Sequence, residues 1–182
     1  NLDLGHCKSL QNVDGLANCR NLTSIDLSCC ESLQNVDGLT NLTNLTSLDQ
    51  STCKSLQNVD ALTNCSKLTN LDLSWCEFLQ NVDGLANLTK LISLNLRYCT
   101  SLQNVDFLAN LTNITKLSLS EVKINVDVLI NLTNLTNLDL SSCNLQNVDS
   151  LANLTNLTNL DLSRCDLQNV DSLANLTNLT NL

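Results

Sequence analysis

Aromatic and basic side chains are scarce in this sequence of 182 residues. Aromatic residues make up 2% and apolar residues 43%, so any core must be almost entirely aliphatic. Nine Lys and Arg residues face eighteen Asp and Glu residues, which gives a net charge of −9 and a pI of about 4.2. Nucleic acids and anionic membrane surfaces are bound through Lys and Arg. The composition therefore argues against both as partners.

Motifs for catalysis and for membrane insertion are also missing. The chain has no phosphate-binding loop, no G-x-S-x-G and no H-E-x-x-H, and its only His for acid–base work is His6. No apolar run is long enough to span a bilayer, and no signal peptide is visible. We therefore expect no enzyme, no catalytic residue, no cofactor and no membrane insertion.

One phrase is written again and again along the chain. NLTNLTNLDLSSC at residues 131–143 returns as NLTNLTNLDLSRC at residues 153–165. Equivalent positions follow one another at steps of 21 to 23 residues: Leu22, Leu45, Leu68, Leu91, Ile114, Leu135, Leu157 and Leu179. A fixed period in the low twenties with the pattern L-x-x-L-x-L-x-x-C-x-x-L is the leucine-rich repeat signature. About eight copies cover residues 1–182 as one array.

The ends of the sequence bear on its completeness. The chain contains no Met and no Pro, and it begins with NLDLGHC, which matches the middle of the repeat. Its last residue, Leu182, falls in the same column as Leu2. Repeat arrays need polar capping units at their ends. We expect a fragment of a longer protein that lacks both caps.

Alternation within each repeat predicts one short strand. Successive side chains of a strand point to opposite faces, so the Leu and Ile residues of the SLDLS-type stretches point inward. Stacking these stretches in parallel, about 4.8 Å apart, makes the core that no repeat can form alone. The predicted strands are Ser24–Ser28, Ser47–Ser51, Asn70–Ser74, Ser93–Arg97, Lys116–Ser120, Asn137–Ser141 and Asn159–Ser163.

The repeats resemble the internalin-like class of leucine-rich repeats, which share L-T-N-L-T-x-L-x-L. They are also similar to the cysteine-containing repeats of some protist proteins, with C-x-x-L-x-x-V as in Cys76–Val82. The resemblance implies an α/β fold: a right-handed solenoid with a parallel β-sheet on its concave face and short 3₁₀ or helical turns on its convex face. It also implies a binding role and brings no shared catalytic residue.

Ten Cys residues raise the question of disulfides or metal. Seven occupy one column just after the strand, where Val122 replaces the thiol in the sixth repeat: Cys7, Cys30, Cys53, Cys76, Cys99, Cys143 and Cys165. Cys19 and Cys65 stand where other repeats have Leu, so we expect small buried hydrophobes. Without a C-x-x-C motif, the column indicates a packed ladder of reduced thiols and no bound metal. Unpaired thiols favour an intracellular, reducing compartment, although a cell-surface location stays open.

Acidic residues form two columns. The first precedes stretches such as GLANLTN and is expected to cap a short helix or 3₁₀ turn: Asp14, Asp37, Asp60, Asp83, Asp106, Asp127, Asp149 and Asp171. The second lies in mid-strand and is expected to face the concave side: Asp3, Asp26, Asp49, Asp72, Asp139 and Asp161, interrupted by Asn95 and Ser118. This acidic row is either a solvated surface copied with the repeat or a seat for a cation or a basic partner.

One column varies while its neighbours barely change. It reads His6, Cys29, Thr52, Trp75, Tyr98, Glu121, Ser142 and Arg164. Trp75 and Tyr98 are predicted to be neighbours at the edge of the concave face, beside Arg97, with Asp72 and Glu121 nearby. Trp, Tyr and Arg are enriched at binding hot spots. These five residues are the candidate partner-binding site; the alternative is drift at a permissive exposed position.

Gln50 breaks the inward Leu column. A buried amide without partners costs about 1–3 kcal/mol. We therefore expect either that its side chain bonds backbone at the strand edge or that the register bulges there.

Three functions remain. The first is a monomeric array that binds a protein or peptide on its concave face, a basic one if the acidic row takes part. The second is a structural or adhesive spacer. The third is an ice-binding surface made by the hydroxyl column Thr23, Thr46, Thr69, Thr115, Thr136 and Thr158, which Ile92 interrupts.

Overall fold

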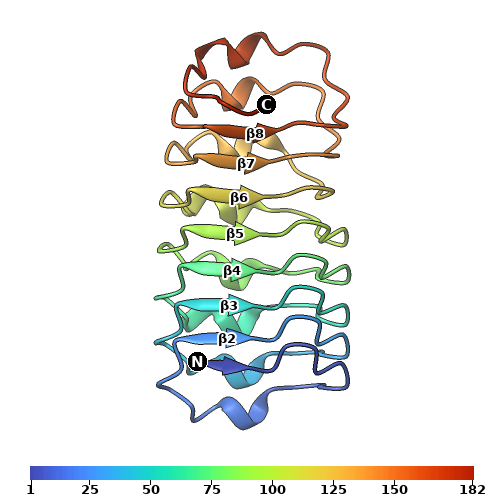
Figure 1. The fold of residues 1–182 in the computed structure, drawn as a ribbon, viewed down its shortest axis with the longest axis vertical. Helices are drawn as coiled ribbons and strands as arrows, with labels where there is room; N and C mark the ends of the chain where they lie inside the picture. Colours follow the sequence, from blue (N-terminus) through green and yellow to red (C-terminus); the bar gives the residue numbers. More distant parts are fainter.

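The computed structural model describes all residues 1–182 and is a solenoid built on one eight-stranded parallel sheet (Figure 1). The strands follow one another in chain order, from β1 to β8. Their bounds are β1 Leu2–Asp3, β2 Ser24–Asp26, β3 Ser47–Asp49, β4 Asn70–Asp72, β5 Ser93–Asn95, β6 Lys116–Ser118, β7 Asn137–Asp139 and β8 Asn159–Asp161. Each repeat consists of one strand and the 3₁₀ helix that follows it.

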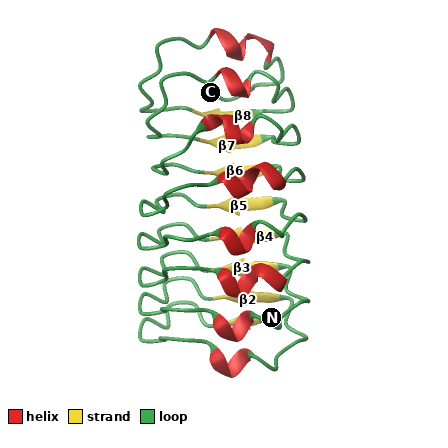
Figure 2. Ribbon diagram, turned by 180° about the vertical axis from the view of Figure 1, so that it is seen from behind, coloured by secondary structure: helices red, strands yellow, loops and turns green.

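The 3₁₀ helices line up on the far side of the stack (Figure 2). Their bounds are η1 Asp14–Leu16, η2 Asp37–Leu39, η3 Asp60–Asn64, η4 Asp83–Leu85, η5 Asp106–Asn110, η6 Val126–Leu129, η7 Asp149–Leu151 and η8 Asp171–Asn175. The side of the sheet that points away from the 3₁₀ helices is the one expected to be concave, and we call it the sheet face. None of these 3₁₀ helices has the length and hydrophobicity that a bilayer-spanning helix requires.

Register between strands follows the sequence columns without a slip. Ile25 pairs with Leu48 and Leu48 with Leu71, so each inward side chain lies on its equivalent in the next repeat. The core between sheet and 3₁₀ helices is aliphatic apart from buried Cys residues, Phe107 and Gln50. The two-residue deletion in the sixth repeat leaves this pairing intact, because Leu117 still pairs with Leu138.

The strands are shorter than predicted. Five residues were expected in each, but β2 to β8 have three. The physical reason lies in the last residue of the strand, which is an Asp in six of the eight: the Oδ1 atom of Asp26 accepts from the backbone N of Ser28 at 2.8 Å, which bends the chain. Asn95 at the end of β5 accepts from the Arg97 amide in the same way. Pairing nevertheless continues through the bend, since the Cys29 amide donates to the Ser51 carbonyl at 2.7 Å.

The expected capping role of the first acidic column is wrong. Asp37 begins η2, and no side chain caps η2 at Val36. The backbone amide of Asp37 instead donates to the Oδ1 atom of Asn35 at 3.3 Å. The same bond, from the Asp amide to the Asn two residues earlier, recurs at Asp14, Asp60, Asp83, Asp127 and Asp171. The Asn two residues before each Asp forms the local turn. The exposed Asp carboxylates therefore do not cap the 3₁₀ helices.

Six of the seven thiols of the Cys ladder form hydrogen bonds to backbone carbonyls, whereas Cys7 is exposed, against prediction, and forms none. All ten Cys are unpaired. The Sγ atoms of Cys53 and Cys99 donate to carbonyls of the preceding repeat, Leu27 and Leu73, at 3.2 and 3.1 Å. Burial raises the pKa of both thiols to about 12. Cys65 is buried as expected, whereas Cys19, in the first repeat of the given sequence, is exposed, against prediction.

Both expectations for Gln50 are wrong. Its side chain is fully buried, and neither amide atom finds a hydrogen-bond partner. The register does not bulge, because Asp49 stays paired with Asp72 and the Gln50 amide donates to the Asp72 carbonyl at 2.8 Å. The regular backbone carries Gln50 into the core in place of Leu.

Candidate interaction surface

The variable column lies in the tight turn after each strand. All eight of its residues have φ between 57° and 64°, in the left-handed region. This conformation strains a side chain with a Cβ, and Gly or Asn tolerates it best. Neither Gly nor Asn occurs in the column, although Asn is abundant in the chain. The side chains at this position are therefore not those that the backbone alone favours.

Trp75 and Tyr98 stack on one another in this column, as the sequence predicted. Their ring centroids are 3.9 Å apart and the ring planes 15° from parallel. The Trp75 amide donates to the Arg97 carbonyl at 2.8 Å, so the paired turns hold both rings in line. The Trp75 side chain is 42% exposed and Tyr98 half-buried. The guanidinium of Arg97 lies over the Tyr98 ring, 5.1 Å from its centroid.

Asp72 and Glu121 lie differently with respect to this pair. The Asp72 carboxylate accepts from the Ser74 amide at 2.8 Å, the Ser74 hydroxyl at 2.6 Å and the Asn95 amide group at 2.9 Å. Both oxygens of the Asp72 carboxylate are thus held by hydrogen bonds within the fold. Glu121 is exposed and makes no ion pair. The single ion pair of the chain joins Lys8 and Glu31 at 2.8 Å.

The Asp residues of the acidic row hold the turn after each strand, a role that the sequence analysis did not predict. In each of its members, the Oδ1 atom accepts from the backbone amide two residues later, as Asp49 does from Ser51 at 2.8 Å. The two interruptions are also explained, because Asn95 donates to Asp72 and Ser118 to Asp139. Hydrogen bonds from the Ser163 hydroxyl and amide, with a smaller contribution from Arg97, lower the pKa of Asp161.

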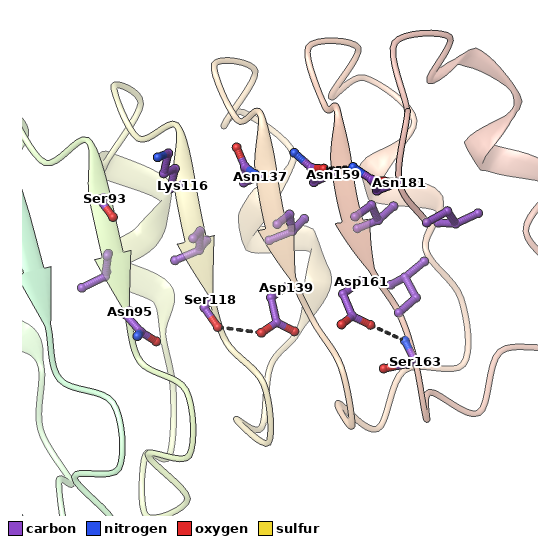
Figure 3. Close-up of a pocket in the computed structure, with 16 residues that line it drawn as sticks. Ser93, Asn95, Lys116, Ser118, Asn137, Asp139, Asn159, Asp161, Ser163 and Asn181 are labelled. Atoms are coloured by element: carbon purple, nitrogen blue, oxygen red, sulfur yellow. Dashed lines mark hydrogen bonds between the residues drawn. The ribbon is translucent and has the colours of Figure 1, made fainter. Parts of the chain in front are cut away.

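A groove of about 800 Å³ runs over β5 to β8 on the sheet face (Figure 3). Its walls are two rows of polar side chains, and its floor is the strand backbone with the edges of the inward Leu residues. One wall is Asn95, Ser118, Asp139 and Asp161, and the other is Ser93, Lys116, Asn137, Asn159 and Asn181.

Sequence reasoning singled out the acidic members of the first wall and missed the second. The signal was available, since the residue before an inward Leu shares a face with the residue after it. The Trp75–Tyr98 pair follows β4 and β5, so it lies in the turns beside the first strand of the groove.

Comparison with known proteins supports the fold. No protein-family profile matches the sequence, and no curated protein matches it. Among solved structures, an internalin C2 from Listeria monocytogenes has a TM-score of 0.76 and 27% identity over 96% of this chain and 71% of its own. TLR13, solved as a complex with ssRNA13, has a TM-score of 0.67 and 24% identity over 94% of this chain and 30% of its own. The predicted solenoid of leucine-rich repeats is confirmed.

Proposed function

We propose that this chain, a leucine-rich repeat protein similar to the internalins, is a non-catalytic interaction module that binds a protein or peptide on its sheet face. The likeness to an internalin supports an interaction module in general. The stacked, exposed pair Trp75 and Tyr98 carries the finer proposal, in which the pair and Arg97 anchor the partner.

The anchor argument begins with what folding requires at this column. Thr52 and Ser142 occupy equivalent turns, so a small side chain suffices there. A large ring at a left-handed position adds strain and leaves apolar surface in water. The core gains nothing from either ring, because it is filled by aliphatic residues. Binding a partner gives both rings and the neighbouring guanidinium a use, since such residues dominate interface energetics.

We propose a protein partner rather than a nucleic acid. The net charge is −9, and the sheet face carries the acidic row. Phosphate backbones would be repelled by both. The RNA in the TLR13 complex belongs to that protein, and a likeness at 24% identity concerns the fold alone.

The alternatives have less support. In the Thr column, the hydroxyls of Thr46 and Thr158 donate to carbonyls of the preceding repeat at 2.9 and 3.1 Å, as do those of Thr69, Thr115 and Thr136. This ladder ties the repeats together, so an ice-binding role is not needed to explain it. A spacer would tolerate the variable column but gives no reason for an aromatic stack within it.

The test starts from partner capture with the purified chain, followed by titration of each captured protein in purified form. The double variant Trp75→Ser/Tyr98→Ser should weaken the direct interaction by about 30-fold or more. The control Ile92→Thr/Ile130→Ala removes two other exposed apolar side chains and restores the residues of other repeats. Equal affinities for the parent and the Trp75/Tyr98 variant would refute the anchor.

A further inference from the structure

Charge is divided unevenly along the sheet face. Four positions of each repeat are compared, on the sheet face and in the turn that follows the strand: the first and third residues of the strand stretch and the two residues of the turn, of which Ser74 and Ser120 are buried. In repeats 1 to 4 these positions hold four carboxylates and no Lys or Arg. In repeats 5 to 8 they hold three acids, Glu121, Asp139 and Asp161, and three bases, Arg97, Lys116 and Arg164. The Trp75–Tyr98 stack lies at the boundary between the acidic half and the neutral half.

Three of the four carboxylates in the acidic half, those of Asp3, Asp26 and Asp49, have one oxygen open to a partner, whereas the second oxygen of Asp72 accepts from Asn95. Asp26 and Asp49 use one oxygen for the turn amide, and their second oxygens accept no hydrogen bond. No cation of the chain forms an ion pair with them. The column just beyond the turn alternates between basic and acidic residues, Lys8, Glu31, Lys54 and Glu77, so it adds no net charge. Like charges repeated at the strand spacing repel one another, and an external cation relieves that repulsion.

Trp75 adds a second feature that suits a cation. One face of its indole is covered by Tyr98, so its 42% exposure belongs to the other face and the ring edges. The neighbour of that face in the variable column is Thr52, a small side chain. Arg97 lies over the Tyr98 ring, whereas no cation of the chain lies over Trp75. Lys and Arg side chains bind well over an indole face.

We propose that the partner presents an extended segment with basic side chains at one end, which lie over repeats 1 to 4 and against Trp75, while its uncharged end fills the groove over β5 to β8. This deepens the proposed function and rests on it. Seven strand intervals of about 4.8 Å amount to about 34 Å, which an extended chain covers with about ten residues. Charge complementarity selects the basic end, and the balanced charges and amide groups of the groove suit the uncharged end.

A synthetic peptide provides a defined probe: Arg-Ser-Arg-Ser-Arg followed by Leu-Thr-Ser-Leu-Thr, with amidated and acetylated ends. A control peptide replaces each Arg by citrulline, which keeps the shape of the side chain and removes its charge. Trp75 is the chain's only Trp, so its fluorescence reports binding at the boundary. The Arg peptide should bind saturably at low salt and the citrulline peptide at least about 10-fold more weakly. Absence of saturable binding of the Arg peptide up to about 1 mM would overturn the proposal.

A matched pair of variants locates the contact. The double variant Asp26→Asn/Asp49→Asn should lower the affinity for the Arg peptide by about 5- to 10-fold, as expected for the loss of two exposed charge pairs. The fold tolerates Asn at this position, because Asn95 accepts from the Arg97 amide at 3.1 Å. The control Asp37→Asn/Asp60→Asn removes the same charge from the same repeats at exposed positions of η2 and η3. Equal weakening by both variants, or by neither, would overturn the proposal.

The two proposals fail separately. A captured protein that depends on Trp75 and Tyr98 but not on Asp26 and Asp49 leaves the interaction module standing and refutes the basic segment. A peptide that depends on Asp26 and Asp49, together with captured proteins that ignore Trp75 and Tyr98, supports the basic segment and refutes the anchor.

Discussion

The indole of Trp75 lies flat against the phenol ring of Tyr98, with ring centroids 3.9 Å apart, although the two residues are 23 positions apart in the chain. Because both rings are outside the core, Trp75→Ser/Tyr98→Ser should lower the free energy of unfolding by no more than about 1.5 kcal/mol, the upper worth of an aromatic pair. Urea unfolding of the parent and the variant measures this difference. A larger loss would mean that the stack is part of the fold, and the case for a binding role would weaken.

The left-handed turns predict a stabilising substitution. Thr52 is a β-branched residue at φ 62°, where its side chain crowds the backbone. Thr52→Asn should raise the free energy of unfolding by about 1 kcal/mol, because Asn tolerates this conformation. The same exchange at the exposed Thr43, which has no positive φ, is the control and should have little effect. Equal shifts at both positions would show that the backbone conformation is not the cause.

Gln50 predicts a second stabilising substitution. Gln50→Leu removes two unpartnered buried polar atoms and restores the Leu found in the equivalent positions of other repeats. The free energy of unfolding should rise by about 1–3 kcal/mol, the usual penalty for such groups. Gln57→Leu, at an exposed site of the same repeat, is the control for a general effect of Leu. A destabilised Gln50→Leu protein would contradict the unpartnered state of this amide.

The Cys ladder predicts a split in thiol reactivity. With a disulfide-exchange reagent at neutral pH, Cys7 and Cys19 should react quickly because they are exposed. Buried thiols such as Cys53, Cys76 and Cys99 should react only on unfolding. Denatured but unreduced protein should titrate as ten thiols. A lower count would reveal a disulfide and contradict the ladder of reduced thiols.

The raised thiol pKa values predict a loss of stability in alkali. Burial raises the pKa of Cys53 and Cys99 from the ordinary value of 9.0 to about 12. Their stabilising contribution is therefore complete below pH 9 and is lost as pH rises toward 12, because the unfolded chain releases these protons first. Each thiol should lower the free energy of unfolding by up to about 1.4 kcal/mol per pH unit in that range.

Urea unfolding between pH 8 and pH 11 measures this slope. Cys53→Val/Cys99→Val should flatten it, and the fold accepts Val in this column because Val122 is buried there. Replacing the exposed Cys7 and Cys19 by Val is the control. An unchanged slope in the Cys53/Cys99 variant would assign the alkaline effect to other groups.

Sequence alone determined the repeating architecture. A period of 21 to 23 residues and the alternation around Leu48 or Leu71 identify strands, inward columns and register, because these depend on local geometry that every repeat shares. The same columns brought Trp75 next to Tyr98, since stacking in register superimposes equivalent positions.

Tertiary structure decided what depends on the neighbouring repeat or on the exact turn. Three features depend on which atoms meet after stacking. They are the left-handed turn at Trp75, the Asn35 hydrogen bond that replaces the expected Asp37 cap, and the lack of hydrogen-bond partners for the Gln50 side-chain amide. The groove likewise arises only when several strands lie side by side, because a single repeat has no walls.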